Sequence, residues 1–511
     1  MKTGIGVVGV VGAGAMGRGI AQIAAQAGYN VLLFDVQADA AEKARQLIEE
    51  QWQKMLNKEK LSEEEYQDAL ECLQVVENLQ GLADCDLVIE AIVEKLEAKR
   101  GLFQQLDGIL SEFCILATNT SSLSVTAIAT GSKWPERVAG LHFFNPVPLM
   151  KVVEVINGLL TGESVAQKLV DFSKRVGHLP VRARDTPGFI VNHAGRGYGT
   201  EALRILQENV ASFRQIDQIM REAAGFKLGP FELLDLTGLD VSHPVMEAIY
   251  HQYYEEPRYR PSVITAQRLH AGVLGRKSGR GFYAYATHEA DETEAEVGPA
   301  WSGSVWIDRG NPQATAVLTD LFEQCGAEIE TGDRPSGTAL CIVSPDGEDV
   351  STCVVNACLD ARRTLGIDSL LDCKGHISLM TNPATDVDIA LQCQSLLRRG
   401  GLGVSLIQDS AGFVVQRILA TIINIACDIV QQGICSPADL DKAVVLGLAY
   451  PMGPLAWGDK LGASRILLVL RNLLDSTGDP RYRPSPWLVR RAQLGLSLLH
   501  VPGQMLDQVT Q

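Results

Sequence analysis

The sequence predicts an α/β domain built on a parallel sheet, followed by an all-α domain, and then a degenerate α/β unit with a duplicated all-α domain. Three observations predict this order. Strand-like and helical patterns alternate over residues 1–184, and helical patterns alone fill residues 185–285. A set of short motifs from that helical region returns near the end of the chain. Alternating patterns are typical of parallel sheets, and repeated motifs at one spacing indicate duplication.

Size and composition narrow the class of protein. The chain has 511 residues, of which 46% are hydrophobic, enough for several domains. We expect no membrane helix and no signal peptide, because no run of eighteen apolar residues and no basic, apolar and small-residue leader is present. Eleven cysteines without a Cys-x-x-Cys pair predict reduced thiols in the cytoplasm. The net charge of −16 argues against nucleic acid as a partner.

The N-terminus carries a glycine-rich turn. An apolar strand pattern over residues 4–12 leads into Gly12-Ala13-Gly14-Ala15-Met16-Gly17 and then into a helical pattern. Gly12 allows the tight turn, Gly14 lets the backbone approach a pyrophosphate, and Gly17 permits close helix packing. Ala15 and Met16 begin a helix whose N-terminus attracts phosphates. A glycine-rich turn in some other βαβ unit is the alternative when these glycines are taken alone.

An acidic residue completes the motif. A second strand pattern over residues 29–34 ends in Asp35. Strand, Gly-x-Gly-x-x-Gly, helix, strand and acid together are the signature of a Rossmann-type dinucleotide-binding domain, with the acid on the ribose hydroxyls. Val36 and Gln37 carry no positive charge for a 2′-phosphate, so NAD is favoured over NADP. Glu90, Lys95 and Asn119, which lie at the next strand ends or helix start, are predicted to line the same cofactor site.

Residues 38–78 interrupt the alternation with a helical hairpin. One helix is predicted over residues 40–56, and a second starts at Ser62, where Glu65 completes a capping box. Three lysines occupy the tip between them: Lys54, Lys58 and Lys60. Two interpretations stay open: a solvated, charged hairpin, or a basic tip that binds the phosphates of a large anionic substrate carrier.

Two further segments carry polar groups at strand ends. The strand over residues 114–117 leads into Asn119-Thr120-Ser121-Ser122-Leu123; we expect Ser122 to cap the next helix, which leaves Ser121 for a substrate oxygen. His142 ends the strand before an Asn-Pro turn, and Glu154 follows in the next strand-like run. A carboxylate on one imidazole nitrogen leaves the other free to take a proton. The alternative is a structural histidine.

These motifs resemble the L-3-hydroxyacyl-CoA dehydrogenase family over roughly residues 4–285. The likeness is carried by residues 12–17, 119–123, 141–146, Glu154, 185–192 and 229–233. It implies that His142 removes the hydroxyl proton, that Glu154 orients it, and that Ser121 and Asn192 hold the substrate oxygen. It also implies a CoA thioester substrate, held in part by Lys54 and Lys60 of the hairpin. We expect no metal, because this oxidation requires none and no histidine has metal-ligand spacing. One departure is His193, where the family leads us to expect arginine. A capping side chain is the alternative for Asn192.

The second half contains an internal repeat. Gly188-Phe189 recurs as Gly412-Phe413 and Gly229-Pro230 as Gly453-Pro454, both 224 positions later. We therefore predict a domain over residues 1–184 with the hairpin 38–78, and a helical domain over 185–285. A linker over 286–300, a degenerate α/β domain over 301–408 and a repeat of the helical domain over 409–511 follow. The duplicated helical domains predict an internal pseudo-dimer or a homo-oligomer.

The copy is not expected to be a second active site. Gln416 stands at the position of Asn192, and pairing the two Asn-Pro dipeptides places Leu379 at the position of His142. The long form with a degenerate second half resembles the branch of the family that oxidises 3-hydroxyadipyl-CoA in phenylacetate degradation. Arg184, Arg196 and Lys227 are candidates to bind its distal carboxylate. A 3-hydroxybutyryl-CoA dehydrogenase, a hydroxy-acid dehydrogenase that acts without CoA, and a cofactor-binding regulatory protein remain alternatives.

Overall fold

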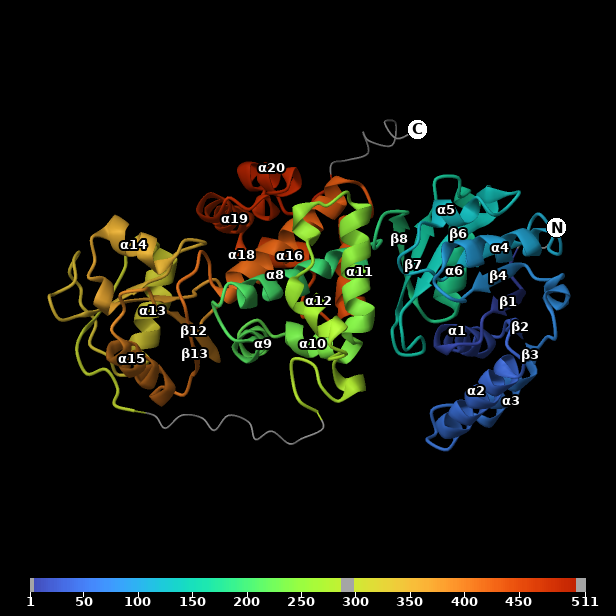
Figure 1. Cartoon of the computed structure of the whole chain (residues 1–511), viewed down its shortest axis with the longest axis horizontal. Helices are drawn as coiled ribbons and strands as arrows, with labels where there is room; N and C mark the ends of the chain where they lie inside the picture. Colours follow the sequence, from blue (N-terminus) through green and yellow to red (C-terminus); the bar gives the residue numbers. More distant parts are fainter. Residues whose placement is uncertain (1–3, 286–297, 502–511) are drawn as a thin grey trace. The chain divides into compact units, whose positions relative to one another are not determined.

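The computed structural model describes residues 4–285 and 298–501 (Figure 1). They form two compact units. The first unit contains residues 1–193 and 432–448, and the second contains residues 194–431 and 449–511. Most of the predicted linker, residues 286–297, lies outside the described residues.

The first unit is built on an eight-stranded sheet in the order β3-β2-β1-β4-β5-β6-β7-β8. Its strands are β1 (Val7–Val11), β2 (Asn30–Phe34), β3 (Leu73–Val75), β4 (Leu87–Glu90), β5 (Ile115–Thr118), β6 (Val138–Phe143), β7 (Val152–Asn157) and β8 (Leu179–Arg184). All neighbours are parallel except β6 and β7. The strand order reverses between β1 and β4, the place where open α/β sheets bind ligands. The predicted dinucleotide-type domain is thus present.

The helices of the first unit follow the predicted alternation. They are α1 (Ala15–Gln26), α2 (Ala40–Leu56), α3 (Glu63–Glu71), α4 (Leu96–Asp107), α5 (Val125–Ala129), α6 (Glu163–Arg175) and α17 (Pro437–Leu448), with α7 (Val191–Ala194) at the unit boundary and 3-10 turns η1 (Leu79–Leu82) and η2 (Pro135–Arg137). The hairpin of α2 and α3 is present (Figure 1), and the capping box of Ser62 and Glu65 is confirmed. The prediction that Ser122 caps α5 is wrong. Ser124, one residue before the helix, accepts the hydrogen bond from Ala127 N–H instead.

The second unit holds a smaller sheet in the order β13-β12-β11-β10-β9. Its strands are β9 (Val305–Ile307), β10 (Leu340–Val343), β11 (Thr364–Ile367), β12 (His376–Met380) and β13 (Gly403–Ile407), and its helices are α13 (Pro312–Gln324), α14 (Val350–Ala357) and α15 (Val387–Arg399), with the turn η5 (Ala361–Arg363). Only β11 and β12 are antiparallel. The strands β9 to β13 therefore repeat the pattern of β4 to β8. Among the described residues, this sheet has no counterparts of β1, β2 and β3.

Helices make up the rest of the second unit. The first group is α8 (Arg196–Gln207), α9 (Phe213–Glu222), α10 (Pro230–Thr237), α11 (Leu239–Gln252) and α12 (Val263–His270), with turns η3 (Pro257–Tyr259) and η4 (Arg276–Ser278). The later group is α16 (Val414–Gln431), α18 (Pro454–Leu461), α19 (Ala463–Thr477), η6 (Pro480–Tyr482) and α20 (Pro486–Leu494). Within the described part of the chain, α16 is the one helix long and apolar enough to cross a membrane, and 94% of its apolar window is buried inside the protein. It is the central core helix, packed on α8, α18, α19 and α20.

Candidate active site

The glycine turn between β1 and α1 is shaped by close backbone approaches. Gly12 has a φ of 103°, a conformation that favours glycine, and its N–H donates to Phe34 O on β2 (2.8 Å). A Cβ on Gly17 would lie 1.7 Å from Gly12 O, so a side chain there would break the turn. Gly14 has open space at its Cβ position and begins α1 without a side-chain cap. The uncapped helix start and the open space suit a pyrophosphate.

Asp35 is tied to this turn. Its Oδ2 accepts from Ala13 N–H (2.7 Å) and its Oδ1 from Gln37 N–H (2.8 Å). The predicted acid therefore lies beside the predicted glycine turn, at the end of β2. A carboxylate fixed in this way can accept hydrogen bonds from two ribose hydroxyls.

His142 and Glu154 are directly opposite each other on the antiparallel strands β6 and β7. His142 Nδ1 lies 2.5 Å from Glu154 Oε2, and both side chains are buried. The other carboxylate oxygen, Oε1, accepts from the N–H groups of Ile190 and Val191 (both 2.9 Å). Because both oxygens of Glu154 are held, the imidazole is fixed in place. Its Nε2 is the nitrogen left to exchange a proton.

Ser121 and Asn192 come together beside the loop that follows β5. Asn192 Nδ2 donates to Ser121 O at 3.4 Å, although the two residues are 71 positions apart. The neighbouring Asn119 uses its side-chain Oδ1 to accept from Phe143 N–H (2.8 Å), which ties the ends of β5 and β6 together. The four residues predicted to do the chemistry, His142, Glu154, Ser121 and Asn192, thus all belong to the first unit.

Glu90 and Lys95, both predicted to line the cofactor site, lie in different surroundings, and their cofactor roles stay predictions. Glu90 is fully buried, and its carboxylate accepts from Lys99 Nζ (2.6 Å), Thr118 Oγ1 (2.7 Å) and Ile92 N–H (2.8 Å). It therefore supports the strand ends from inside. Lys95 is exposed and begins α4. The reasoning from sequence missed Lys99, although a lysine on the apolar face of a helix predicts a buried partner.

The hairpin lysines are exposed, as a docking role requires. Trp52 on α2 is fully buried, whereas Lys54, Lys58 and Lys60 lie at the exposed end of the hairpin. The cation candidates for a distal carboxylate are spread over the chain. Arg184 ends β8 and is exposed, burial lowers the pKa of Arg196 on α8 to about 10, and Lys227 is exposed after α9.

The second sheet corrects the predicted match to His142. The pairs Gly366–Met380 and Ile367–Leu379 repeat the register of Gly140–Ile156 and Leu141–Val155. Asp368, the residue that directly follows β11, therefore occupies the position of His142, and Leu379 does not. Sequence pairing of the two Asn-Pro dipeptides misled the prediction, because the second dipeptide follows β12 and the first follows β6.

The space beside Asp368 is small, and a side chain of α16 occupies part of it. Gln416 Nε2 donates to Asp368 Oδ1 (3.1 Å) and to Pro345 O (3.0 Å). Ser378 is the counterpart of Glu154, because it lies 224 positions later and β12 pairs with β13 in the register in which β7 pairs with β8. Ser378 is therefore placed opposite Asp368, as Glu154 is placed opposite His142. The cavity lined by Asp368 and Ser378 measures about 10 Å³, roughly the space of one water molecule.

Two family models and several known proteins are similar to this chain. The 3-hydroxyacyl-CoA dehydrogenase NAD binding domain model matches residues 7–186, and the C-terminal domain model of the same family matches residues 188–285 and again 412–497. An Escherichia coli protein named 3-hydroxyadipyl-CoA dehydrogenase is 38% identical over 97% of this chain and 99% of that protein. Mouse mitochondrial hydroxyacyl-coenzyme A dehydrogenase is 43% identical over 54% of this chain and 90% of its own length. The crystal structure of an E. coli K12 3-hydroxybutyryl-CoA dehydrogenase covers 96% of this chain and 98% of that chain, with 36% identity and a TM-score of 0.82.

Proposed function

Because the chain belongs to the 3-hydroxyacyl-CoA dehydrogenase family and is an NAD-dependent enzyme, we propose that it oxidises 3-hydroxyadipyl-CoA to 3-oxoadipyl-CoA in the breakdown of phenylacetate and related aromatic compounds. The relative with that name matches almost the whole chain, second half included. Relatives named for 3-hydroxybutyryl-CoA also match, so that substrate is the second candidate. The observation that carries the chemistry is the buried pair of His142 and Glu154.

His142 is the proposed base. Oxidation of a secondary alcohol removes a proton from the hydroxyl as the hydride leaves the carbon, and NAD supplies the hydride acceptor. With Nδ1 bound to Glu154, Nε2 of His142 takes that proton. The fixed carboxylate of Glu154 then stabilises the imidazolium, and its contacts with Ile190 and Val191 keep it from turning away.

The other proposed contacts, with the substrate oxygen, NAD and CoA, are inferred from where the residues lie. Ser121 and Asn192 donate to the substrate oxygen, and their proximity supports this role. The residues of the turn, Gly12, Gly14, Ala15, Met16 and Gly17, hold the pyrophosphate of NAD, while Asp35 binds its ribose hydroxyls. The exposed Lys54 and Lys60 attract the phosphates of CoA. Because the chain is acidic overall, an anionic CoA thioester depends on local cations such as these two lysines for electrostatic attraction.

We also propose that the second half is a degenerate duplicate that forms a pseudo-dimer inside one chain. Two backbone hydrogen bonds support this: Arg184 N–H donates to Ile434 O in the first unit, and Gln408 N–H donates to Val210 O in the second (both 2.9 Å). Their donors and their acceptors are each 224 positions apart. Correspondingly, α17 packs on β7 and β8, and α9 packs on β12. We propose that this copy binds no cofactor, because its sheet lacks counterparts of β1, β2 and β3 among the described residues. Asp368 also stands where the first copy has His142.

A second reciprocal pair supports the same view. Arg483 lies 3.4 Å from Glu256, and Arg260 lies 4.0 Å from Asp479. Each partner is 223 positions from its counterpart. Fused copies that cover each other's apolar helices need no second chain at that face. The free thiols of all eleven cysteines fit the proposed cytoplasmic location.

The substrate proposal is tested by steady-state reduction of 3-oxoadipyl-CoA and acetoacetyl-CoA with NADH. We expect a higher kcat/KM for 3-oxoadipyl-CoA, because a cation must bind the distal carboxylate. Comparison with methyl-esterified 3-oxoadipyl-CoA isolates that carboxylate. A clear preference for acetoacetyl-CoA would instead assign the chain to the 3-hydroxybutyryl-CoA dehydrogenases.

A further inference from the structure

Glu94, between β4 and α4, holds the loop that carries Ser121. Its Oε1 accepts from three consecutive residues of that loop: Thr120 Oγ1 (2.6 Å), Ser121 N–H (2.9 Å), Ser122 N–H (3.1 Å) and Ser122 Oγ (3.1 Å). The loop is 26 to 28 positions away in the sequence. One carboxylate oxygen therefore gathers the donors of the whole turn.

A buried lysine holds Glu94 in turn. Lys99 Nζ lies 3.2 Å from Glu94 Oε2 and 2.6 Å from Glu90 Oε1, and the Lys99 side chain is 1% exposed. Burial acts to raise the pKa of Glu94, but the charge of Lys99 and the hydrogen bonds from Thr120 and Ser121 outweigh it, so the pKa is lowered. Glu94 is thus ionised at neutral pH, and an ionised acceptor makes the stronger hydrogen bonds.

The hydroxyl of Ser121 is held differently from its neighbours. Its Oγ lies 3.5 Å from Glu94 Oε1, at the limit of a hydrogen bond, whereas the other donors lie at 2.6 to 3.1 Å. The backbone of Ser121 is fixed, but its hydroxyl is only weakly engaged. The carbonyl of the same residue accepts from Asn192 Nδ2. Both proposed donors to the substrate oxygen therefore depend on where this loop is placed.

We propose that Glu94 is a positioning residue for the reaction: it fixes the backbone of residues 120–122 so that the Ser121 hydroxyl and the Asn192 amide converge on the substrate oxygen. The inference rests on the proposed role of Ser121. It goes further in naming the group that aims Ser121 and in explaining why Ser121, among three hydroxyl residues in sequence, is the one available to substrate. The hydroxyls of Thr120 and Ser122 both donate hydrogen bonds to Glu94.

A residue that merely stabilises the fold would behave differently from one that acts through Ser121. Loss of general stability lowers the active fraction by the same factor in any background, so its effect multiplies with that of another substitution. Loss of positioning matters only while the Ser121 hydroxyl is present. A double-mutant cycle between Glu94 and Ser121 separates the two cases.

The test uses the full chain with Glu94→Gln, Ser121→Ala and the double variant, assayed by NADH-dependent reduction of a 3-oxoacyl-CoA. Glutamine keeps the size of Glu94 but removes the charge that Lys99 and the loop donors bind. We expect Glu94→Gln to lower kcat by about 10- to 100-fold, because outright removal of one oxyanion donor costs about 10²- to 10³-fold and a misplaced donor should cost less. We expect the double variant to be no worse than about twofold below the poorer single variant. Glu97→Gln is the matched control, because Glu97 lies three residues on, is 83% exposed and pairs with Arg100 only among the described ion pairs.

Three results would overturn the inference. The first is parental kcat in Glu94→Gln, with thermal unfolding confirming that the variant is folded. The second is a double variant whose loss is the product of the two single losses, which would leave the role of Ser121 intact and remove that of Glu94. The third is parental kcat in Ser121→Ala, which would remove the proposed role of Ser121 and this inference with it. Glu94→Asp, which keeps the charge but shortens the reach, gives a second variant if Glu94→Gln does not fold.

Discussion

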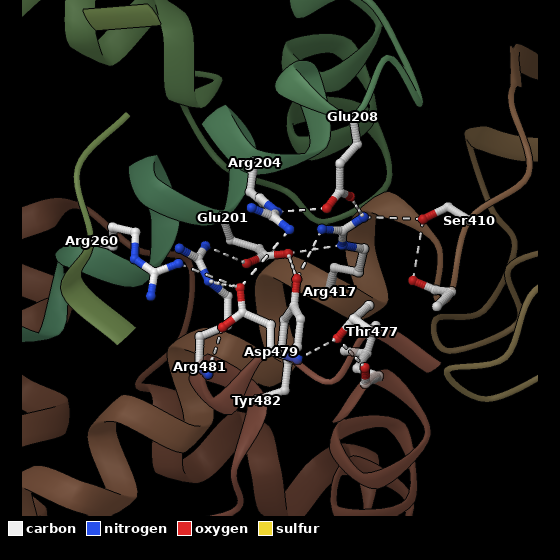
Figure 2. Close-up of polar contacts among 12 residues, drawn as sticks. Glu201, Arg204, Glu208, Arg260, Ser410, Arg417, Thr477, Asp479, Arg481 and Tyr482 are labelled. Atoms are coloured by element: carbon white, nitrogen blue, oxygen red, sulfur yellow. Dashed lines mark hydrogen bonds and ion pairs between the residues drawn. The ribbon is translucent and has the colours of Figure 1, made fainter. Parts of the chain in front are cut away.

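Arg417 and Glu201 form a buried ion pair in the joined helical core, with Arg417 Nε donating to Glu201 Oε1 at 2.8 Å. Their side chains are 2% and 0% exposed. Figure 2 shows the surrounding network: Tyr482 OH donates to the same Glu201 oxygen (2.8 Å), and Arg417 Nη1 donates to Glu208 Oε2 (2.6 Å). The counterparts 224 positions earlier and later are His193 and Ile425, which cannot form such a pair. The duplication therefore does not repeat this ion pair.

Removing one partner of this pair should destabilise the protein strongly. Arg417→Met leaves the buried Glu201 with Arg481, at 3.5 Å, as its remaining ionic partner. We therefore expect a loss of about 3 kcal/mol, at the lower end for a broken buried pair, and a drop in Tm of several degrees. Arg417→Met combined with Glu201→Leu should recover part of that loss, because both buried charges are gone. Thermal unfolding of the three proteins measures this.

The exposed pair of Arg483 and Glu256 provides the control. Arg483 is 59% exposed, so Arg483→Gln should change stability by less than about 1 kcal/mol. Equal Tm values for Arg417→Met and Arg483→Gln would refute the importance assigned to the buried pair.

The hairpin lysines should act on substrate binding rather than on chemistry. We expect Lys54→Ala combined with Lys60→Ala to raise KM for an acyl-CoA about 3- to 30-fold with little change in kcat, since each exposed charge contributes about 0.5–1 kcal/mol. The difference should shrink as salt is added. Lys168→Ala combined with Lys174→Ala removes two exposed charges on α6, outside the hairpin, and should leave KM unchanged. An unchanged KM in the Lys54 and Lys60 variant would favour a substrate without CoA.

Asp368 should make the stability of the second unit depend on pH. Burial raises the pKa of Asp368 from its usual 3.8 to about 6, and its Oδ2 has no hydrogen-bond partner among the described residues. The folded protein thus holds a proton that the unfolded chain releases, so this contribution to stability is present below about pH 4 and is lost as pH rises to about 6.

Asp368→Asn removes that dependence. At pH 8 we expect the free energy of unfolding of Asp368→Asn to exceed that of the parent by on the order of 1 kcal/mol, with a correspondingly higher Tm. Near pH 4 the two proteins should have the same Tm. The exposed Asp372→Asn should show no such difference. A variant that is less stable than the parent at pH 8 would show that the charged form of Asp368 is stabilised instead.

The parts of the fold and site that depend on local pattern could be predicted from the sequence. The helix 40–56, the capping box at Ser62 and the glycine turn beside Asp35 are set by neighbours in the sequence. The pairing of His142 with Glu154 was also predictable, because two adjacent strands joined by a short turn place such residues side by side.

Features that depend on register or on distant partners could not be predicted. Two consecutive hydroxyl residues and a third nearby can all cap a helix, and only the backbone decides that Ser124 does so. The register of β11 with β12, which puts Asp368 at the position of His142, does not follow from matching dipeptides. The buried Glu90 and the loop-binding Glu94 differ only through contacts made after folding.

The proposed mechanism depends most on the proton acceptor at position 142. The direct measurement is kcat of His142→Gln for reduction of 3-oxoadipyl-CoA, with NADH binding followed by fluorescence to show that the cofactor site is intact, and His251→Gln, 64% exposed, as control. Loss of general acid–base catalysis predicts a fall in kcat of about 10²- to 10⁴-fold with NADH affinity unchanged. A His142→Gln enzyme that keeps more than half of the parental kcat would contradict the mechanism.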